Sequence, residues 1–151
     1  MDIKLETMLK HRLAYVRKVG PYGTTNYEAM VQLKKWAEER GLLTDRAVLY
    51  GIPQDNPEIT PPKQCRYDAC IAIAEDYPLD ESILESELAG GSYAVCTVMH
   101  TAEDIQRAWA KLLPTIERLG YKIDNTPIIE RYTGELLIKN LCEICVPIKP
   151  I

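Results

Sequence analysis

The sequence predicts an α+β domain built from two copies of one unit, each with several strands and one helix. Three observations predict it: two amphipathic segments that each end at a glycine, strand-like segments around both, and residues that match between the halves. The chain has 151 residues, 46% of them hydrophobic, which suits one compact domain or two small fused modules. We predict one domain over residues 1–151, with half-repeats at about 1–76 and 80–151.

The first half is expected to contain four strands and one helix. The strands are predicted at Ile3–Met8, Arg12–Val19, and about 46–52 and 65–74. Thr25-x-x-Glu28 has the spacing of a capping box, in which a hydroxyl and a carboxylate satisfy free amides at a helix start. Apolar residues then recur at helical spacing up to the stop at Gly41: Tyr27, Met30, Val31, Leu33 and Ala37.

The second half repeats this order of elements. Strands are expected at Ile83–Glu87, Ser92–Met99, and about 127–132 and 141–148. A helix begins at the cap Thr101-x-x-Asp104 and ends at Gly120, and Pro114 inside it should produce a kink. Its apolar stripe consists of Ile105, Ala108, Trp109, Leu112, Leu113, Ile116 and Leu119.

Aligning the two stop glycines, Gly41 and Gly120, gives an offset of 79 residues. Identical residues then coincide at several equivalent places: Leu5 with Leu84, Glu6 with Glu85, Val16 with Val95, Ala29 with Ala108, and Leu33 with Leu112. We therefore predict a tandem βαββ repeat. Its antiparallel sheet should carry both helices on one face and leave a ligand groove on the other.

Composition excludes several classes of function. The net charge of −4 provides no basic surface for nucleic acid, and neither a membrane-length apolar stretch nor a secretion signal occurs, so we expect a cytoplasmic protein. Five cysteines suit a reducing compartment, and on a strand Cys142 and Cys145 point to opposite faces, which argues against a disulfide or a zinc site. We expect no metal and no cofactor. Nine tyrosines and two tryptophans suit a half-wet cavity wall, or simply the core.

The last strand contains a carboxylate among apolar residues. Alternation places Glu143 opposite the face that carries Cys142, Ile144, Val146 and Ile148. A buried carboxylate needs a partner. Glu143 is therefore either an edge residue that contacts solvent or a basic side chain, or the floor of a ligand cavity.

Several segments together resemble the GyrI-like effector-binding family, whose members occur alone or attached to bacterial AraC-type and MerR-type regulators. The resemblance covers nearly the whole chain. It is carried by Ala14-Tyr15-Val16, Gly20-Pro21-Tyr22, Pro62 followed by Cys65-Arg66-Tyr67-Asp68, Gly90-Gly91-Ser92-Tyr93-Ala94-Val95, the helix around Trp109, Glu130-x-Tyr132 and Glu143-x-x-x-Pro147-Ile148.

The resemblance implies a pseudo-two-fold α+β fold whose central cavity binds bulky, often cationic, aromatic molecules. Glu143 matches the acid that faces the cation, while Trp109 and Tyr132 match cavity positions. Tyr67, Asp68 and Tyr93 belong to matching motifs and are further ligand-binding candidates, although Asp68 could simply pair with Arg66. His100 is a weak candidate, because Thr101 follows it where the family often has glycine.

Three functions compete, and the resemblance implies the second and the third, because some members of the family are described as inhibitors of DNA gyrase and some relatives hydrolyse strained electrophilic rings. The first is a stand-alone binder of hydrophobic, cationic or aromatic compounds that senses or sequesters a drug or toxin. The second is a role in protein interaction, with DNA gyrase or a transcription regulator as partner and the acidic segment 75–87 as a contact. The third is a hydrolase of strained electrophiles, in which Glu143 beside Trp109 acts as general base.

Overall fold

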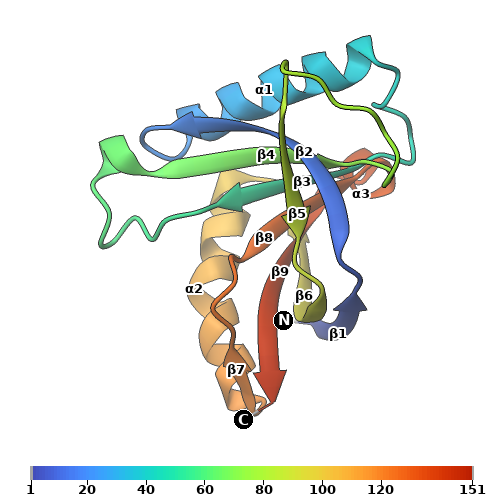
Figure 1. Ribbon diagram of the computed structural model, residues 1–151. Helices are drawn as coiled ribbons and strands as arrows, with labels where there is room; N and C mark the ends of the chain where they lie inside the picture. Colours follow the sequence, from blue (N-terminus) through green and yellow to red (C-terminus); the bar gives the residue numbers. More distant parts are fainter. Residues whose placement is uncertain (1, 151) are drawn as a thin grey trace.

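A computed structural model describes residues 2–150, which form nine strands and three helices (Figure 1). The strands are β1 (Ile3–Met8), β2 (His11–Val19), β3 (Val48–Pro53), β4 (Arg66–Ala72), β5 (Leu84–Leu88), β6 (Gly91–Met99), β7 (Tyr121–Ile123), β8 (Ile129–Thr133) and β9 (Leu141–Pro150). The helices are α1 (Thr24–Glu39), α2 (Ala102–Arg118) and the short α3 (Gly134–Ile138). The predicted strands and both long helices are present, whereas β7 and α3 were not predicted.

The strands form one curled antiparallel sheet in the order β1-β6-β9-β8-β3-β4-β2-β5, with β7 added beside β9. The order reads the same from either end when β1 is exchanged with β5, β2 with β6, β3 with β8 and β4 with β9. A duplicated unit would produce this pattern. Duplication itself stays a prediction.

Both long helices pack on the same face of the sheet, as the sequence predicted. Cys142 and Ile144 are two residues apart on β9 and therefore share one face. Cys142 belongs to the core beneath α1, where Leu33 and Trp36 are buried, whereas Ile144 belongs to the core beneath α2, with Leu112. Figure 1 shows α1 across one end of the sheet and α2 along the other.

The cavity formed within residues 2–150 does not lie on the opposite face, so the predicted position of the ligand groove is wrong. The sheet curls onto this face and buries a second core. The turns that follow the two edge strands meet there: a Cβ at Gly90 would lie 2.9 Å from the Lys10 amide, and Lys10 pairs with Glu87 at 3.7 Å. This core consists of Met8, Leu13, Tyr50, Ile52, Cys70, Leu88, Tyr93, Val95, Ile129 and Cys145.

The two predicted caps have different outcomes. Thr101 caps α2, because its hydroxyl accepts a hydrogen bond of 3.1 Å from the Asp104 amide. The capping box predicted at Thr25 is wrong: α1 begins after Gly23 without a side-chain cap, and Thr25 is buried in its first turn. Gly23 has a φ of 113°, which a side chain would strain.

All five cysteines are free and buried. Cys142 lies in the core beneath α1 and Cys145 in the core of the other face, which agrees with the alternation predicted for this strand. Burial raises the pKa of each of these two thiols to about 12, so both are protonated and unreactive at neutral pH.

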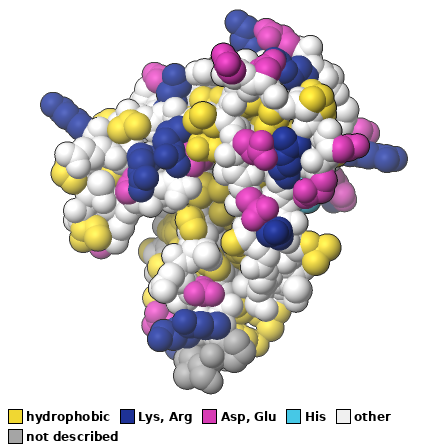
Figure 2. Space-filling view, in the orientation of Figure 1, with side chains coloured by type: hydrophobic (Ala, Val, Ile, Leu, Met, Phe, Trp, Pro, Cys, Tyr) yellow, Lys and Arg dark blue, Asp and Glu magenta, His cyan; other side chains and the backbone are white. Residues whose placement is uncertain are grey.

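Basic and acidic side chains are interspersed on the face shown in Figure 2, without a large area of one sign among the described residues. This distribution fits the small net charge. No helix within residues 2–150 is both long and apolar enough to cross a membrane.

Candidate functional site

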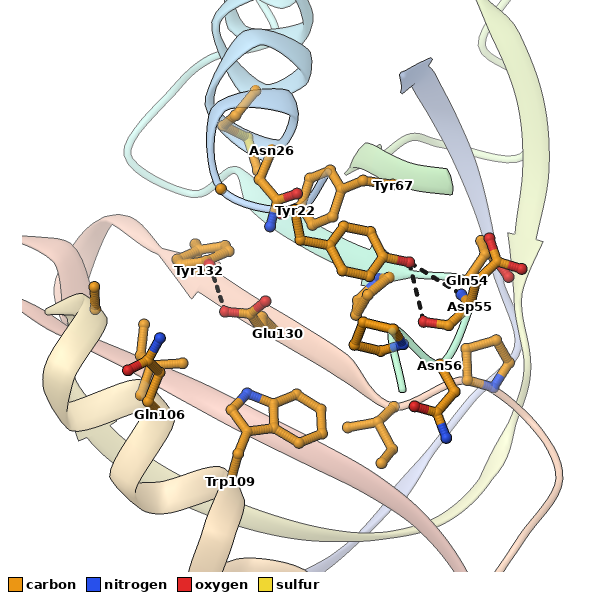
Figure 3. A pocket seen from close by; sticks show the side chains of 18 of the residues that line it. Tyr22, Asn26, Gln54, Asp55, Asn56, Tyr67, Gln106, Trp109, Glu130 and Tyr132 are labelled. Atoms are coloured by element: carbon orange, nitrogen blue, oxygen red, sulfur yellow. Dashed lines mark hydrogen bonds between the residues drawn. The ribbon is translucent and has the colours of Figure 1, made fainter. Parts of the chain in front are cut away.

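A cavity of about 1330 Å³ lies between α1 and α2, on the face of the sheet that carries the helices (Figure 3). Its walls are the first half of α1, the loop 53–58 after β3, the inner side of α2 and the segment 123–128 before β8. The residues that form its floor come from β3, β4 and β8. The volume is large enough for a ligand with several aromatic rings.

Each long helix presents one stripe to the core and a neighbouring stripe to the cavity. On α2, Ala108, Leu112 and Ile116 are buried in the core, whereas Ile105, Trp109 and Leu113 line the cavity. On α1, the cavity stripe is Tyr27, Met30, Val31 and Lys34. The indole of Trp109 is directed into the cavity (Figure 3). The two helices therefore supply facing, mostly apolar walls.

Two tyrosines form much of the floor. Tyr132 on β8 and Tyr67 on β4 both line the cavity and are both buried. Tyr67 lies against Gly51 of β3, where a Cβ would be 2.0 Å from the Tyr67 hydroxyl. Only glycine leaves room for this ring position. Gly51 is paired with Glu130 on the neighbouring strand β8, so the Tyr67 ring lies close to the strand that carries Glu130.

Glu130 is the acid on the cavity floor. The residue is 9% exposed, and its Oε2 accepts a hydrogen bond of 3.0 Å from the Tyr132 hydroxyl. Burial raises the pKa of Glu130, and the hydrogen bond from Tyr132 opposes that rise. No Lys or Arg among the described residues forms an ion pair with it. The cavity floor thus carries an uncompensated carboxylate.

His100 also lines the cavity. Its ring lies 5.2 Å from that of Tyr132, measured between centroids. Burial lowers the pKa of His100, and the charge of Lys34 lowers it further, so the imidazole is neutral at pH 7. The neutral ring adds no positive charge beside Glu130. The cation on this side of the cavity is Lys34 of α1, which forms no ion pair with Glu130 within residues 2–150.

Of the six predicted site residues, Trp109, Tyr132 and Tyr67 line the cavity. Glu143 does not, and its predicted position there is wrong. It is 7% exposed on the opposite face, where Arg131 binds it at 2.9 Å and also binds Glu6 at 2.7 Å. Glu143 does face away from the helices, as strand alternation predicted. The error was to place the cavity on that face.

Asp68 and Tyr93 also lie outside the cavity lining. Asp68, 4% exposed, accepts two hydrogen bonds from Arg17, at 2.7 and 2.9 Å, and one from Gln54 at 3.0 Å. Its suggested pairing with Arg66 is wrong, because Arg66 binds the carboxylate of Asp55.

Tyr93 packs in the core of the helix-free face, and its hydroxyl donates to the carbonyl of Ala89 at 2.8 Å. Its contacts are those of a core residue. Within residues 2–150, no three His, Cys, Asp or Glu side chains form a group that could hold a metal ion.

Sequence reasoning missed Glu130 as a site residue. The signal was present in the Glu130-x-Tyr132 pair, because alternation puts both side chains on one face of β8 and puts Ile129 and Arg131 on the other. The apolar Ile129 faces the helix-free core, so Glu130 had to face the helices.

This cavity, with its aromatic walls and one buried acid, is the kind of site found in small-molecule-binding domains. Residues 1–149 match the family described as the GyrI-like small molecule binding domain. The chain belongs to this family.

Two relatives carry names that describe a role. YosT of Bacillus subtilis (strain 168), an SPbeta prophage-derived protein whose name proposes a role in transcriptional regulation, is 40% identical over 99% of this chain and 100% of its own. A DNA gyrase inhibitor of Salmonella typhimurium (strain LT2) is 26% identical over 87% and 86% of the two chains.

Among solved structures, EcmrR in a complex with DNA has a TM-score of 0.76 at 16% identity; the similarity covers 99% of this chain but 58% of EcmrR. SAV2435 bound to tetraphenylphosphonium has a TM-score of 0.57 at 15% identity, over 99% and 94% of the two chains. At these identities the likeness shows the fold alone.

Proposed function

We propose that this protein binds bulky hydrophobic cations in the cavity between α1 and α2. The observation that carries the proposal is Glu130, a buried carboxylate on the floor of an aromatic cavity without a cationic partner among the described residues. Burial of an unpaired charge is unfavourable. A bound cation would compensate that charge, which a neutral ligand cannot do.

The aromatic side chains add to this attraction. Trp109, Tyr67 and Tyr132 line the same cavity as Glu130. A cation over an aromatic face gains about 0.5–2 kcal/mol, depending on how much water is excluded. Flat aromatic walls impose few directional demands, so we expect several ligand skeletons to bind. Sensing or sequestration of a toxic compound is the corresponding role.

A pair of ligands with similar bulk and different charge tests the proposal: methyltriphenylphosphonium, a cation, and triphenylphosphine oxide, which is neutral. Glu130→Gln keeps the shape of the side chain and removes its charge. We expect at least about a tenfold loss for the cation, equivalent to about 1.4 kcal/mol, and little change for the neutral ligand, measured by calorimetry.

Glu143→Gln is the matched control, since it removes a buried carboxylate from the opposite face. The geometry predicts that this variant, once shown to be folded, binds both ligands as the unmodified protein does. Equal losses for both ligands in Glu130→Gln would indicate a purely structural role for Glu130.

Hydrolysis of a strained electrophile is a second candidate, and Glu130 rather than Glu143 is the acid placed to perform it. In its ionised form Glu130 could take a proton from water as the water oxygen attacks an epoxide carbon, and then return that proton to the ring-opened oxygen. Formation of a diol from styrene oxide that is lost in Glu130→Gln would support this activity. Binding of cations without turnover would leave the binding function alone.

Interaction with DNA gyrase is suggested only by the names of relatives such as the Salmonella protein. The candidate contact is still the acidic segment 75–87. Arg12 fixes part of this segment, because it binds Glu85 at 2.9 Å and donates hydrogen bonds to the carbonyls of Glu75 and Tyr77. Inhibition of gyrase supercoiling by the purified protein tests this role.

A further inference from the structure

The buried carboxylate of Glu130 uses little of its capacity to accept hydrogen bonds. An ionised carboxylate offers about four acceptor positions. Among the described residues only the Tyr132 hydroxyl donates to it, through Oε2, and Oε1 receives no hydrogen bond. A ligand that only neutralised the charge would leave these positions empty.

A second unused acceptor lies on the wall of the same cavity. The Oδ1 atom of Asn26 is buried and has no hydrogen-bond partner within the part of the chain that the structure describes. Asn26 is in the first turn of α1 and lines the cavity. Figure 3 shows it projecting from α1, above Tyr132 and Glu130 in this view. Its amide can turn about the terminal bond at low cost and so present the oxygen to a ligand.

We propose that the preferred ligand is a hydrophobic cation that donates N–H hydrogen bonds, such as a protonated primary amine or an amidinium, rather than a quaternary onium ion. This inference rests on the proposed function and narrows its ligand class. An N–H cation compensates the charge of Glu130 and also fills its empty acceptor positions. Asn26 supplies a further acceptor for a second N–H.

The loss of hydration on binding works against a preference for the N–H cation. A primary ammonium group donates hydrogen bonds to water, which a quaternary trimethylammonium group cannot do, so the primary ammonium loses more hydration on entering an apolar cavity. A cavity with a bare charge and aromatic walls would therefore favour the quaternary ion. A preference for the N–H cation requires that Glu130 and Asn26 replace the lost water contacts.

Three ligands on one skeleton test the inference: 9-(aminomethyl)anthracene in its protonated form, (9-anthracenylmethyl)trimethylammonium, and neutral 9-anthracenemethanol. Their affinities for the full chain are measured by fluorescence titration at pH 7. We expect the primary ammonium ion to bind about tenfold more tightly than the trimethylammonium ion, a difference of about 1.4 kcal/mol. Both should bind more tightly than the alcohol.

Asn26→Ala should lower the ratio of the two cation affinities. The Oδ1 atom of Asn26 has no hydrogen-bond partner in the fold, so this variant removes no hydrogen bond to that oxygen, and thermal unfolding verifies that it is folded. Gln32→Ala is the matched control, since Gln32 is an exposed amide on the same helix outside the cavity, and it should keep the ratio.

The outcomes separate the two proposals. Equal affinities for the two cations, or tighter binding of the trimethylammonium ion, would overturn the N–H preference and leave the cation-binding function standing. Cations that bind no more tightly than the alcohol would overturn both. An unchanged ratio in Asn26→Ala would remove that residue from the ligand contacts.

Discussion

The position of Tyr67 on the cavity floor depends on Gly51, and Gly51→Ala should show this. A Cβ at residue 51 would lie 2.0 Å from the Tyr67 hydroxyl oxygen and 2.9 Å from the adjacent ring carbon. The hydroxyl must therefore move by about 1.4 Å to reach the shortest ordinary contact, 3.4 Å. Gly51 has no left-handed φ, so alanine is otherwise compatible with the strand.

Tyr67 belongs to the core beneath α1, is 3% exposed and also lines the cavity, so the open direction for its ring is toward the cavity. Overpacking of this kind costs about 1–3 kcal/mol. We expect Gly51→Ala to lower the free energy of unfolding in urea by this amount. We also expect weaker binding of large cations, because the displaced ring occupies cavity volume.

The double variant Gly51→Ala/Tyr67→Ala tests the cause. Removal of the ring takes away the clash, so the cost of Gly51→Ala should nearly vanish in the Tyr67→Ala background, giving a coupling energy of about 1–3 kcal/mol. A Gly51→Ala protein as stable as the unmodified one would refute the reasoning. Equal costs of Gly51→Ala in both backgrounds would refute it too.

Three further predictions follow from single side chains. Because the pKa of Glu130 is raised, its charged form destabilises the empty fold. Glu130→Gln should therefore unfold at a higher urea concentration than the unmodified protein at pH 7. The difference in stability should shrink as the pH falls through the raised pKa, because Glu130 is then protonated. Arg131→Met leaves the carboxylates of Glu6 and Glu143 without their partner and should lower the free energy of unfolding in urea by roughly 2–4 kcal/mol. Arg107→Met, which breaks an exposed ion pair, should lower it by less than about 1 kcal/mol. Thr101→Ala should cost about 1 kcal/mol by loss of the α2 cap, and Thr24→Ala near zero, as measured by thermal unfolding.

Periodicity predicted the secondary structure well because apolar residues recur at helical spacing on α1 and α2 and at alternate positions on several strands. β9 is buried on both faces and is instead a nearly continuous apolar run. The predicted helix from Thr101 and the strands around residues 92–99 and 141–148 all appear within a few residues. The error at Thr25 has a local reason. The side chain is buried under the Gly20 turn, where its Oγ1 would lie 2.9 Å from a Cβ at Gly20, so it is unavailable as a cap.

The side of the sheet that holds the cavity could not be predicted in this way. An apolar stripe on a helix indicates contact with something apolar, but a core and a cavity wall have the same composition. Tyr27 and Val31 belong to the predicted stripe of α1, and yet they are 72% and 49% exposed at the cavity. Trp36, which the stripe omitted, is buried. The curl of the sheet, which sequence periodicity does not specify, determines which face is occupied by a core and which face carries the cavity.

The two buried acids show what distinguishes a site from a structural ion pair. Glu143 and Glu130 are adjacent to apolar residues on neighbouring strands, and both are nearly buried. Arg131 satisfies Glu143 and also reaches Glu6 on β1, which joins distant strands of the curled sheet. Glu130 faces a cavity and receives one hydrogen bond, from Tyr132. Burial does not distinguish Glu130 from Glu143, because both are nearly buried. The difference is the ion pair: the charge of Glu143 is compensated by Arg131, whereas that of Glu130 is not and is available to a ligand.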